Sequence, residues 1–113
     1  MIESYDFGRM VVDGKEYTSD LIVSPNWVKD GWWRKHGHRL AIEDLEEIIE
    51  KRPEVLVVGT GYSGLLKVPG ETKRHIEEQG IELVVQPTRE AYEAYNALIR
   101  SGRQVVAAFH LTC

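Results

Sequence analysis

The sequence has little cysteine and no excess of positive charge, and it lacks any long apolar run. Its one cysteine, Cys113, leaves no partner for an intrachain disulfide and no multi-cysteine zinc site. No apolar run approaches the roughly 20 residues that a bilayer-crossing helix needs, and the first residues show no signal-peptide pattern. With 14 basic and 18 acidic residues the net charge is −4, which disfavours general binding to nucleic acid or to an anionic membrane. We therefore expect a cytoplasmic protein that binds neither nucleic acid nor membrane.

The remaining composition is that of an ordinary globular protein. Hydrophobic residues make up 42% and charged residues 28% of the 113 positions, so the chain can build a core and disorder is not expected. No stretch rich in Pro, Gly or Ser separates one part from another, and no repeat of fixed period is visible. The sequence predicts a single domain over residues 1–113.

The N-terminal region is typical of β-structure. Short extended runs cover residues 2–7, 9–12, 15–18 and 20–23, and Asp13-Gly14 supplies a two-residue turn signal after the second run. Ser24-Pro25-Asn26 ends the fourth run. These four runs predict a small antiparallel sheet.

From residue 43 onwards, predicted helices alternate with predicted strands. Apolar spacing indicates helices over residues 43–51 and 71–79, and a third that begins at Thr88 and is ended by Gly102. Apolar runs indicate strands over residues 55–58, 81–85 and 104–109. The order strand, helix, strand, helix, strand implies right-handed crossovers and a parallel sheet. The predicted fold class is α/β: a single domain with a parallel core sheet from βαβαβ, helices packed on it, and an N-terminal antiparallel β elaboration.

Residues Gly59 to Gly64 spell G-x-G-x-x-G directly after a predicted strand, the pattern of a dinucleotide-binding loop. Two features argue against a dinucleotide site. Helix breakers occupy Val68-Pro69-Gly70, where the phosphate-facing helix should run, and the acidic residue expected about 20 positions further on is missing. Two alternatives stay open: the loop amides hold a small anion with Lys67 as counter-charge, or the glycines only turn the chain sharply.

If the loop is a site, it lies at the carboxyl end of a parallel strand, where open α/β sheets usually hold ligands. The candidate ligand-binding residues combine loop residues with polar side chains expected nearby: Gly59, Thr60, Gly61, Tyr62, Ser63, Lys67, Asn96 and His110. The chemistry open to such a crevice is small-anion binding or the activity of a small enzyme.

Residues 32–39 combine two adjacent tryptophans with three fixed positive charges and no acid. Aromatic and basic residues together can stack bases in single-stranded nucleic acid, but the chain as a whole is acidic. Trp and Arg are favoured anchors of protein interfaces, so Trp32, Trp33 and Arg34 form a candidate interface. The alternative is structural, with indoles capping the sheet and an arginine paired to a carboxylate.

Catalytic residues cannot be assigned from the sequence. Four histidines, His36, His38, His75 and His110, invite a metal hypothesis, but no further ligand has a supporting local spacing. Ser63 lacks the G-x-S-x-G spacing of a nucleophile elbow. We therefore predict no metal and no cofactor.

With these residues in view, the chain resembles the small, largely uncharacterised domain family that includes the adipogenesis-associated domain protein and a mitochondrial complex I assembly factor. The resemblance rests on Val57-Val58-Gly59-Thr60-Gly61, with Ser63 and Leu66-Lys67-Val68-Pro69 after it. It also rests on Thr88, on Tyr95-Asn96-Ala97-Leu98 and on Ala108-Phe109-His110-Leu111-Thr112-Cys113. It implies an α/β fold with a parallel core sheet and added N-terminal strands, and protein contacts rather than an established reaction.

The leading hypothesis is a non-enzymatic binding or assembly module that contacts a protein partner partly through Trp32, Trp33 and Arg34. The alternative is a small-anion-binding protein or small enzyme that uses the crevice beside residues 59–64. The sequence leaves the oligomeric state and the identity of any partner open.

Overall fold

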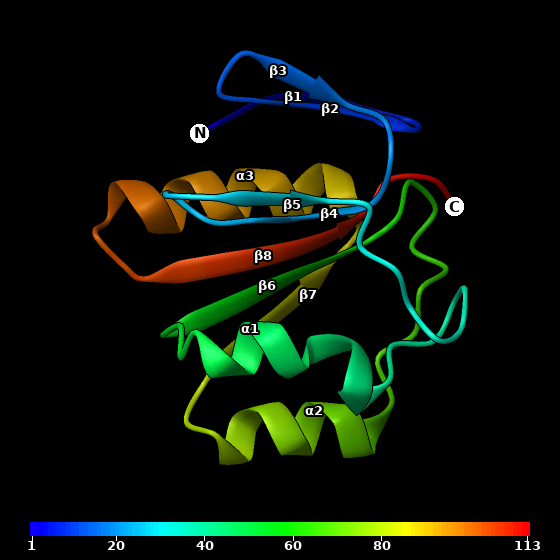
Figure 1. The fold of residues 1–113 in the computed structure, drawn as a ribbon, viewed down its shortest axis with the longest axis vertical. Coiled ribbons are helices and arrows are strands. Elements are labelled where there is room, and N and C mark those ends of the chain that lie inside the picture. Colours follow the sequence, from blue (N-terminus) through cyan, green and yellow to red (C-terminus); the bar gives the residue numbers. More distant parts are fainter.

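The computed structural model describes residues 1–113, which form two sheets and three α-helices (Figure 1). The N-terminal strands β1 (Ile2–Asp6), β2 (Arg9–Val12) and β3 (Lys15–Tyr17) form a three-stranded antiparallel sheet. Between β2 and β3, Asp13 and Gly14 both have positive φ, as the Asp-Gly turn signal predicts. This sheet lies at one end of the molecule, above α3 in Figure 1.

The main sheet has five strands in the order β5-β4-β8-β6-β7. Its strands are β4 (Leu21–Val23), β5 (Val28–Asp30), β6 (Val55–Thr60), β7 (Glu82–Gln86) and β8 (Val105–His110). β6 is parallel to β7 and to β8, while β4 is antiparallel to both β8 and β5. The sheet is therefore mixed, with β8 at its centre.

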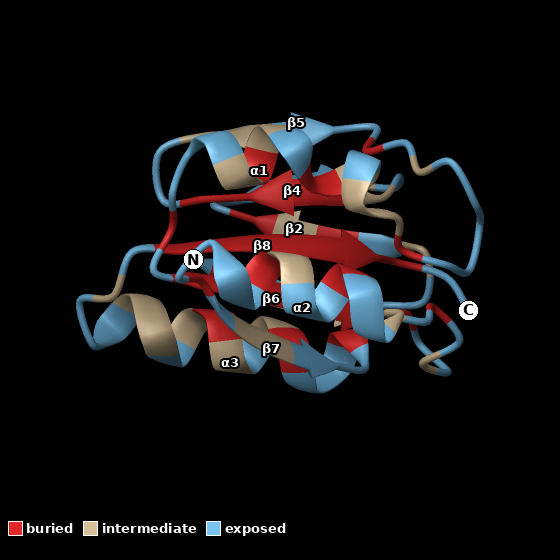
Figure 2. Ribbon diagram, turned by 90° about the horizontal axis from the view of Figure 1, so that it is seen from below, coloured by how far each residue is buried: buried red, intermediate tan, exposed pale blue.

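Helices cover both faces of the main sheet, as Figure 1 shows. A 3₁₀ turn, η1 (Ile42–Leu45), runs into α1 (Glu46–Glu50), which shares one face with α2 (Gly70–Glu78), while α3 (Thr88–Arg100) packs on the other. The inner strands β4, β6 and β8 are buried along their whole length because they have neighbours on both edges and cover on both faces (Figure 2). No helix is both long enough and apolar enough to cross a membrane.

The structure confirms the predicted α/β domain with antiparallel N-terminal strands. The expectation for residues 20–23 was wrong, because Leu21–Val23 pairs with β8 in the main sheet and not with the small N-terminal sheet. The reason is burial: all three side chains of β4 are apolar and buried, and only a central strand offers cover on both faces. The core sheet is accordingly mixed and not purely parallel, and β5 was not predicted at all.

Candidate functional site

The glycine loop begins where β6 ends, and two of its glycines are required by close packing against other parts of the chain. A Cβ on Gly59 would lie 2.6 Å from Cδ1 of Phe109 and 2.8 Å from Oγ1 of Thr88. Gly61 has a φ of +106°, and a Cβ there would lie 2.6 Å from the backbone oxygen of Cys113. Both positions therefore exclude any larger residue.

Several amides in and just after this loop donate to the chain's own oxygen atoms. The Gly61 N–H donates to Thr88 Oγ1 at 2.9 Å, and the Tyr62 N–H donates to the Thr112 carbonyl at 2.6 Å. The Leu65 N–H donates to the Cys113 oxygen at 3.0 Å. None of the four cavities in the structure is lined by residues 59–64. These contacts favour the reading of the glycines as a packed turn.

The other residues expected at this crevice do not all gather there. Ser63 and Lys67 are exposed, and Thr60 is buried at the end of β6. Asn96 lies more than two turns along α3 from its start, and its side chain accepts from the Ile2 N–H at 3.0 Å and donates to the Ile2 carbonyl at 2.7 Å. Asn96 therefore fixes the N-terminal sheet to α3, and its side chain bonds to Ile2 and not to the glycine loop near which it was expected.

Tyr62 packs at the edge of a small aromatic cluster. Its ring centroid lies 5.7 Å from that of Phe7 and 6.4 Å from that of Tyr5, and the Arg89 guanidinium lies 4.9 Å from its ring. The Tyr5 hydroxyl donates to the Leu111 carbonyl at 2.8 Å. Burial raises the pKa of Tyr5 to about 12, so this hydroxyl keeps its proton and remains a donor at neutral pH.

His110 belongs to a buried polar cluster with Asp20 and Arg34, which we call the Asp20 cluster. Because a carboxylate can only accept, the His110 ring donates from Nδ1 to Asp20 Oδ2 at 2.8 Å, and Arg34 Nη2 lies 3.1 Å from the same Nδ1. Arg34 Nη1 donates to Asp20 Oδ2 at 2.7 Å, and the Leu111 N–H donates to Asp20 Oδ1 at 2.8 Å. The Arg34 and His110 side chains are each 7% exposed. The His110 Nε2 and Arg34 Nε atoms are buried without a hydrogen-bond partner.

Asp20 is the negative charge that holds this cluster together. Burial alone would raise the pKa of Asp20, but the hydrogen bonds from His110, the Leu111 N–H and Arg34 outweigh it and hold that pKa below its ordinary value. Asp20 is therefore ionised at neutral pH and balances the Arg34 guanidinium. The carboxylate joins the start of β4, the tryptophan segment and the end of β8.

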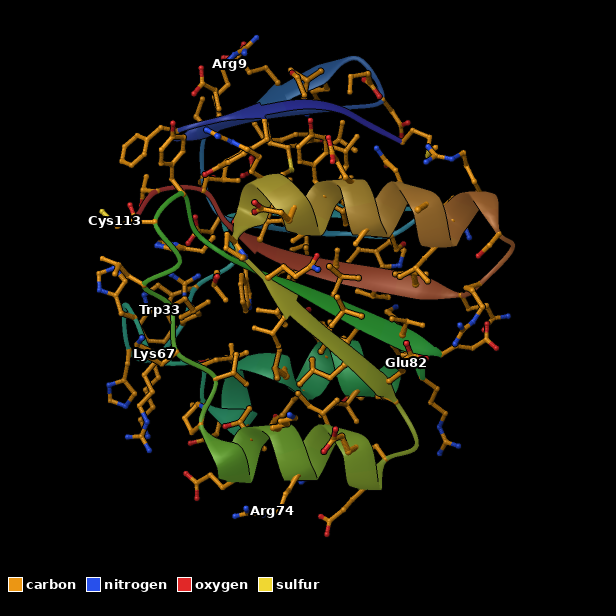
Figure 3. The ribbon with its side chains drawn as sticks, turned by 180° about the vertical axis from the view of Figure 1, so that it is seen from behind. Arg9, Trp33, Lys67, Arg74, Glu82 and Cys113 are labelled. Carbon is orange, nitrogen blue, oxygen red and sulfur yellow. The ribbon has the colours of Figure 1, made fainter.

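The tryptophan segment presents one indole to solvent and buries the other. Trp32 is only 5% exposed, its Nε1–H donates to the Asp44 carbonyl at 3.2 Å, and the Arg34 guanidinium stacks 4.9 Å from its ring. Trp33 is 78% exposed. Of the three predicted interface residues, Trp33 alone offers its side chain at the surface, because Trp32 and Arg34 are used within the domain. Figure 3 shows Trp33, Lys67 and Cys113 on the same side of the molecule.

The histidines do not converge. The ring centroids of His38 and His110 lie 5.7 Å apart, while His36 and His75 take no part in that contact. No group of three or more His, Cys, Asp or Glu side chains is arranged to hold a metal ion.

Asp20 is the residue that sequence reasoning missed. It lies 90 positions before His110, and an acid before an apolar strand carries no local signal of burial. The residues that carry the family resemblance include the end of β8 but not Asp20, so only the three-dimensional structure reveals the Asp20 cluster.

Comparison with known proteins places this geometry among proteins of the same fold. Residues 2–110 match the family described as "Protein of unknown function (DUF498/DUF598)". A human protein named NADH dehydrogenase [ubiquinone] 1 alpha subcomplex assembly factor 3 is 28% identical over 110 residues. The match covers 95% of this chain but 58% of the human protein, so the chain spans little more than half the length of that relative.

Solved structures resemble the fold closely. The crystal structure of a conserved hypothetical protein from Pyrococcus horikoshii OT3 superposes with a TM-score of 0.88 at 32% identity, covering 100% of this chain and 99% of that one. A protein from Bartonella henselae, described as an outer membrane protein, gives a TM-score of 0.83 at 24% identity and covers 99% and 94% of the two chains. The second likeness concerns the fold alone.

Proposed function

Because the chain belongs to the DUF498/DUF598 family, with which residues 2–110 align, we propose that it is a non-enzymatic binding or assembly module that acts through protein contacts. The family resemblance drawn from the sequence is thereby confirmed. A relative named as an assembly factor supports a role in bringing proteins together. The cytoplasmic location and the absence of nucleic-acid binding stay predictions.

The exposed indole of Trp33 is the observation that carries the proposal. A tryptophan that is 78% exposed leaves a large apolar surface in water, and tryptophan is the residue most enriched at the energetic centres of interfaces. The loop around Trp33 is held from beneath by Arg34, whose Nη1 bonds Asp20 and whose Nη2 donates to the Gly37 carbonyl at 3.1 Å. An anchored loop loses little conformational entropy on binding, which favours affinity.

The small-anion alternative draws less support from the structure. The loop amides that were to hold the anion already donate to Thr88, Thr112 and Cys113. We therefore propose that the glycine loop has a structural role and that the protein partner contacts the surface around Trp33.

The proposal is tested by photo-crosslinking in cells that make the protein. Trp33 is replaced by p-benzoylphenylalanine, and the matched control places the same group at Val85, an exposed apolar residue at the end of β7. We expect discrete crosslinked products at position 33 and none at position 85. Products at neither position, or equally at both, would contradict a contact surface at Trp33.

A further inference from the structure

A groove runs between the tryptophan segment and the helical turns that follow it. It is the largest of the four cavities, about 770 Å³, and Trp32 and Trp33 line it from one side. The opposite wall comes from η1 and from the outer side of α1. The bond from Trp32 Nε1 to the Asp44 carbonyl joins the two walls, so the groove is a fixed feature of the surface.

The groove is strongly acidic. Five carboxylates from η1 and α1 line it, against two ammonium groups, those of Lys29 and Lys35. Each lysine is paired with one glutamate: Lys29 Nζ lies 2.7 Å from Glu47, and Lys35 Nζ lies 3.5 Å from Glu43. The lysines therefore neutralise only part of the negative charge, and the groove keeps an excess of carboxylate.

Three carboxylates of the groove have no cation, and one of them, Asp44, accepts instead from the backbone N–H groups of Lys35 and Ala41. Glu46 and Glu50 are exposed, make no ion pair, and stand four residues apart on α1. At that spacing two glutamates lie on the same side of a helix and repel one another. This repulsion lowers the stability of α1, a helix of only five residues, and a cation held between the two carboxylates would remove the repulsion.

Trp33 offers a cation a second kind of contact from the facing wall. No aromatic ring and no cation packs on its indole, although Arg34, Lys51 and Arg89 each pack on other rings. The face of an exposed indole attracts ammonium and guanidinium groups, and the attraction is stronger for Trp than for Tyr or Phe. An aromatic wall facing an acidic wall is complementary to a positively charged side chain with an apolar stem.

We propose that this groove docks a basic segment of the protein partner, with a Lys or Arg side chain held between the Trp33 indole and the carboxylates of Glu46 and Glu50. The inference rests on the proposed function, because it names the chemistry of the partner at the Trp33 surface. An acidic segment would meet the uncompensated carboxylates and be repelled.

The probe for this test is a short capped peptide of alternating Arg and Ser, titrated into the chain of 113 residues. A peptide with Glu at every Arg position serves as the opposite charge. The indole N–H signals of the three tryptophans are followed by NMR and assigned through a Trp33→Phe variant. We expect the Arg peptide to move the Trp33 signal and the Glu peptide to leave it unmoved, with binding weakened as salt is added.

Two double variants distinguish binding in the groove from nonspecific attraction of the Arg peptide to the net negative charge of the chain. The double change Glu46→Gln/Glu50→Gln should weaken binding of the Arg peptide about tenfold, because two exposed ion pairs are lost. Glu90→Gln/Glu93→Gln removes the same charge from α3, on the other face of the sheet, and should leave binding unchanged. Trp33→Ala should weaken it about threefold to fivefold.

The inference is overturned by an Arg peptide that leaves the Trp33 signal unmoved, by full binding to the Glu46/Glu50 double variant, or by equal weakening in the α3 control. The crosslinking at position 33 separates this failure from failure of the proposed function. Crosslinks to an acidic or neutral segment would refute the basic partner and leave the contact surface intact, while no crosslink at all would refute the contact surface itself.

Discussion

Replacing Asp20 by alanine is expected to destabilise the protein by about 3 kcal/mol, although Asp20 lies outside both main hydrophobic clusters. The change leaves the Arg34 guanidinium, 7% exposed, without its carboxylate. It also removes the acceptors of the His110 Nδ1–H and the Leu111 N–H. Removing one partner of a buried ion pair costs about 3–5 kcal/mol because the other charge stays buried, and the 18% exposure of Asp20 favours the lower end of that range.

A loss of this size is a large share of the stability of a domain of 113 residues, which is on the order of 5–15 kcal/mol. It should lower the Tm by about 10 °C. The assay is urea unfolding followed by tryptophan fluorescence, since Trp32 is buried beside the Asp20 cluster and reports on its integrity. The matched control is Asp30→Ala, because Asp30 is exposed and accepts only from the Ser19 hydroxyl, so its loss should stay within about 0.5 kcal/mol.

A double-mutant cycle identifies the cause of the loss. If Asp20 acts by compensating Arg34, then Arg34→Met in the Asp20→Ala background should recover about 2 kcal/mol of the sum of the single effects. The reasoning is refuted if Asp20→Ala unfolds within about 1 kcal/mol of the parent, or if the two changes are additive.

Three further predictions concern pH, the glycine loop and the N-terminal sheet. The pKa of Asp20 is lower in the folded than in the unfolded protein, so the stability that this carboxylate contributes is complete above about pH 5 and is lost as the pH falls through the folded pKa. Asp20→Asn should therefore make the free energy of unfolding less dependent on pH between about pH 5 and pH 2, measured by unfolding at a series of acid pH values. Gly61→Ala should destabilise by about 3 kcal/mol in thermal melts, through overlap with a backbone oxygen at 2.6 Å and a φ of +106°. Gly14→Ala, with positive φ but open space, should cost only about 1 kcal/mol, and equal losses for the two would exclude the overlap as the cause. Asn96→Ala should cost about 2 kcal/mol through its two bonds to Ile2 and should accelerate hydrogen exchange in β1, and unchanged exchange there would contradict the role of Asn96 as a clamp.

Most helices and strands could be predicted from the sequence, but the pairing of the strands in the two sheets could be predicted only in part. Residues 55–58 are apolar in an unbroken run, and such a pattern indicates a buried strand wherever its partners lie. Residues 21–23 carry the same signal, but the pairing of β4 with β8 joins positions more than 80 residues apart, which no local pattern encodes. β5 was not predicted from the sequence because it is short and two of its three residues are exposed.

The sequence also does not predict which individual side chains are exposed at the candidate contact surface. Trp32 and Trp33 are chemically identical neighbours, and only the tertiary structure shows that Trp32 packs in the apolar core and under Arg34 while Trp33 is exposed. The sequence predicts a helix over residues 43–51, but the position of its carboxylates opposite Trp33 follows from the return of the chain through residues 36–42. Glycine spacing, by contrast, suggested a ligand where the structure places the chain's own residues 112 and 113.

The position of β8 at the centre of the main sheet has a consequence for how the protein is made. β8 is the last strand in the chain, yet it joins β4 on one edge to β6 on the other. While a ribosome is adding residues 61–104, those two apolar strands have no common partner, and each exposes an unpaired edge of the kind that aggregates. The main sheet can close only once residues 105–110 are available, so the pairing of β4 and β6 through β8 comes after the other strands of that sheet have been made.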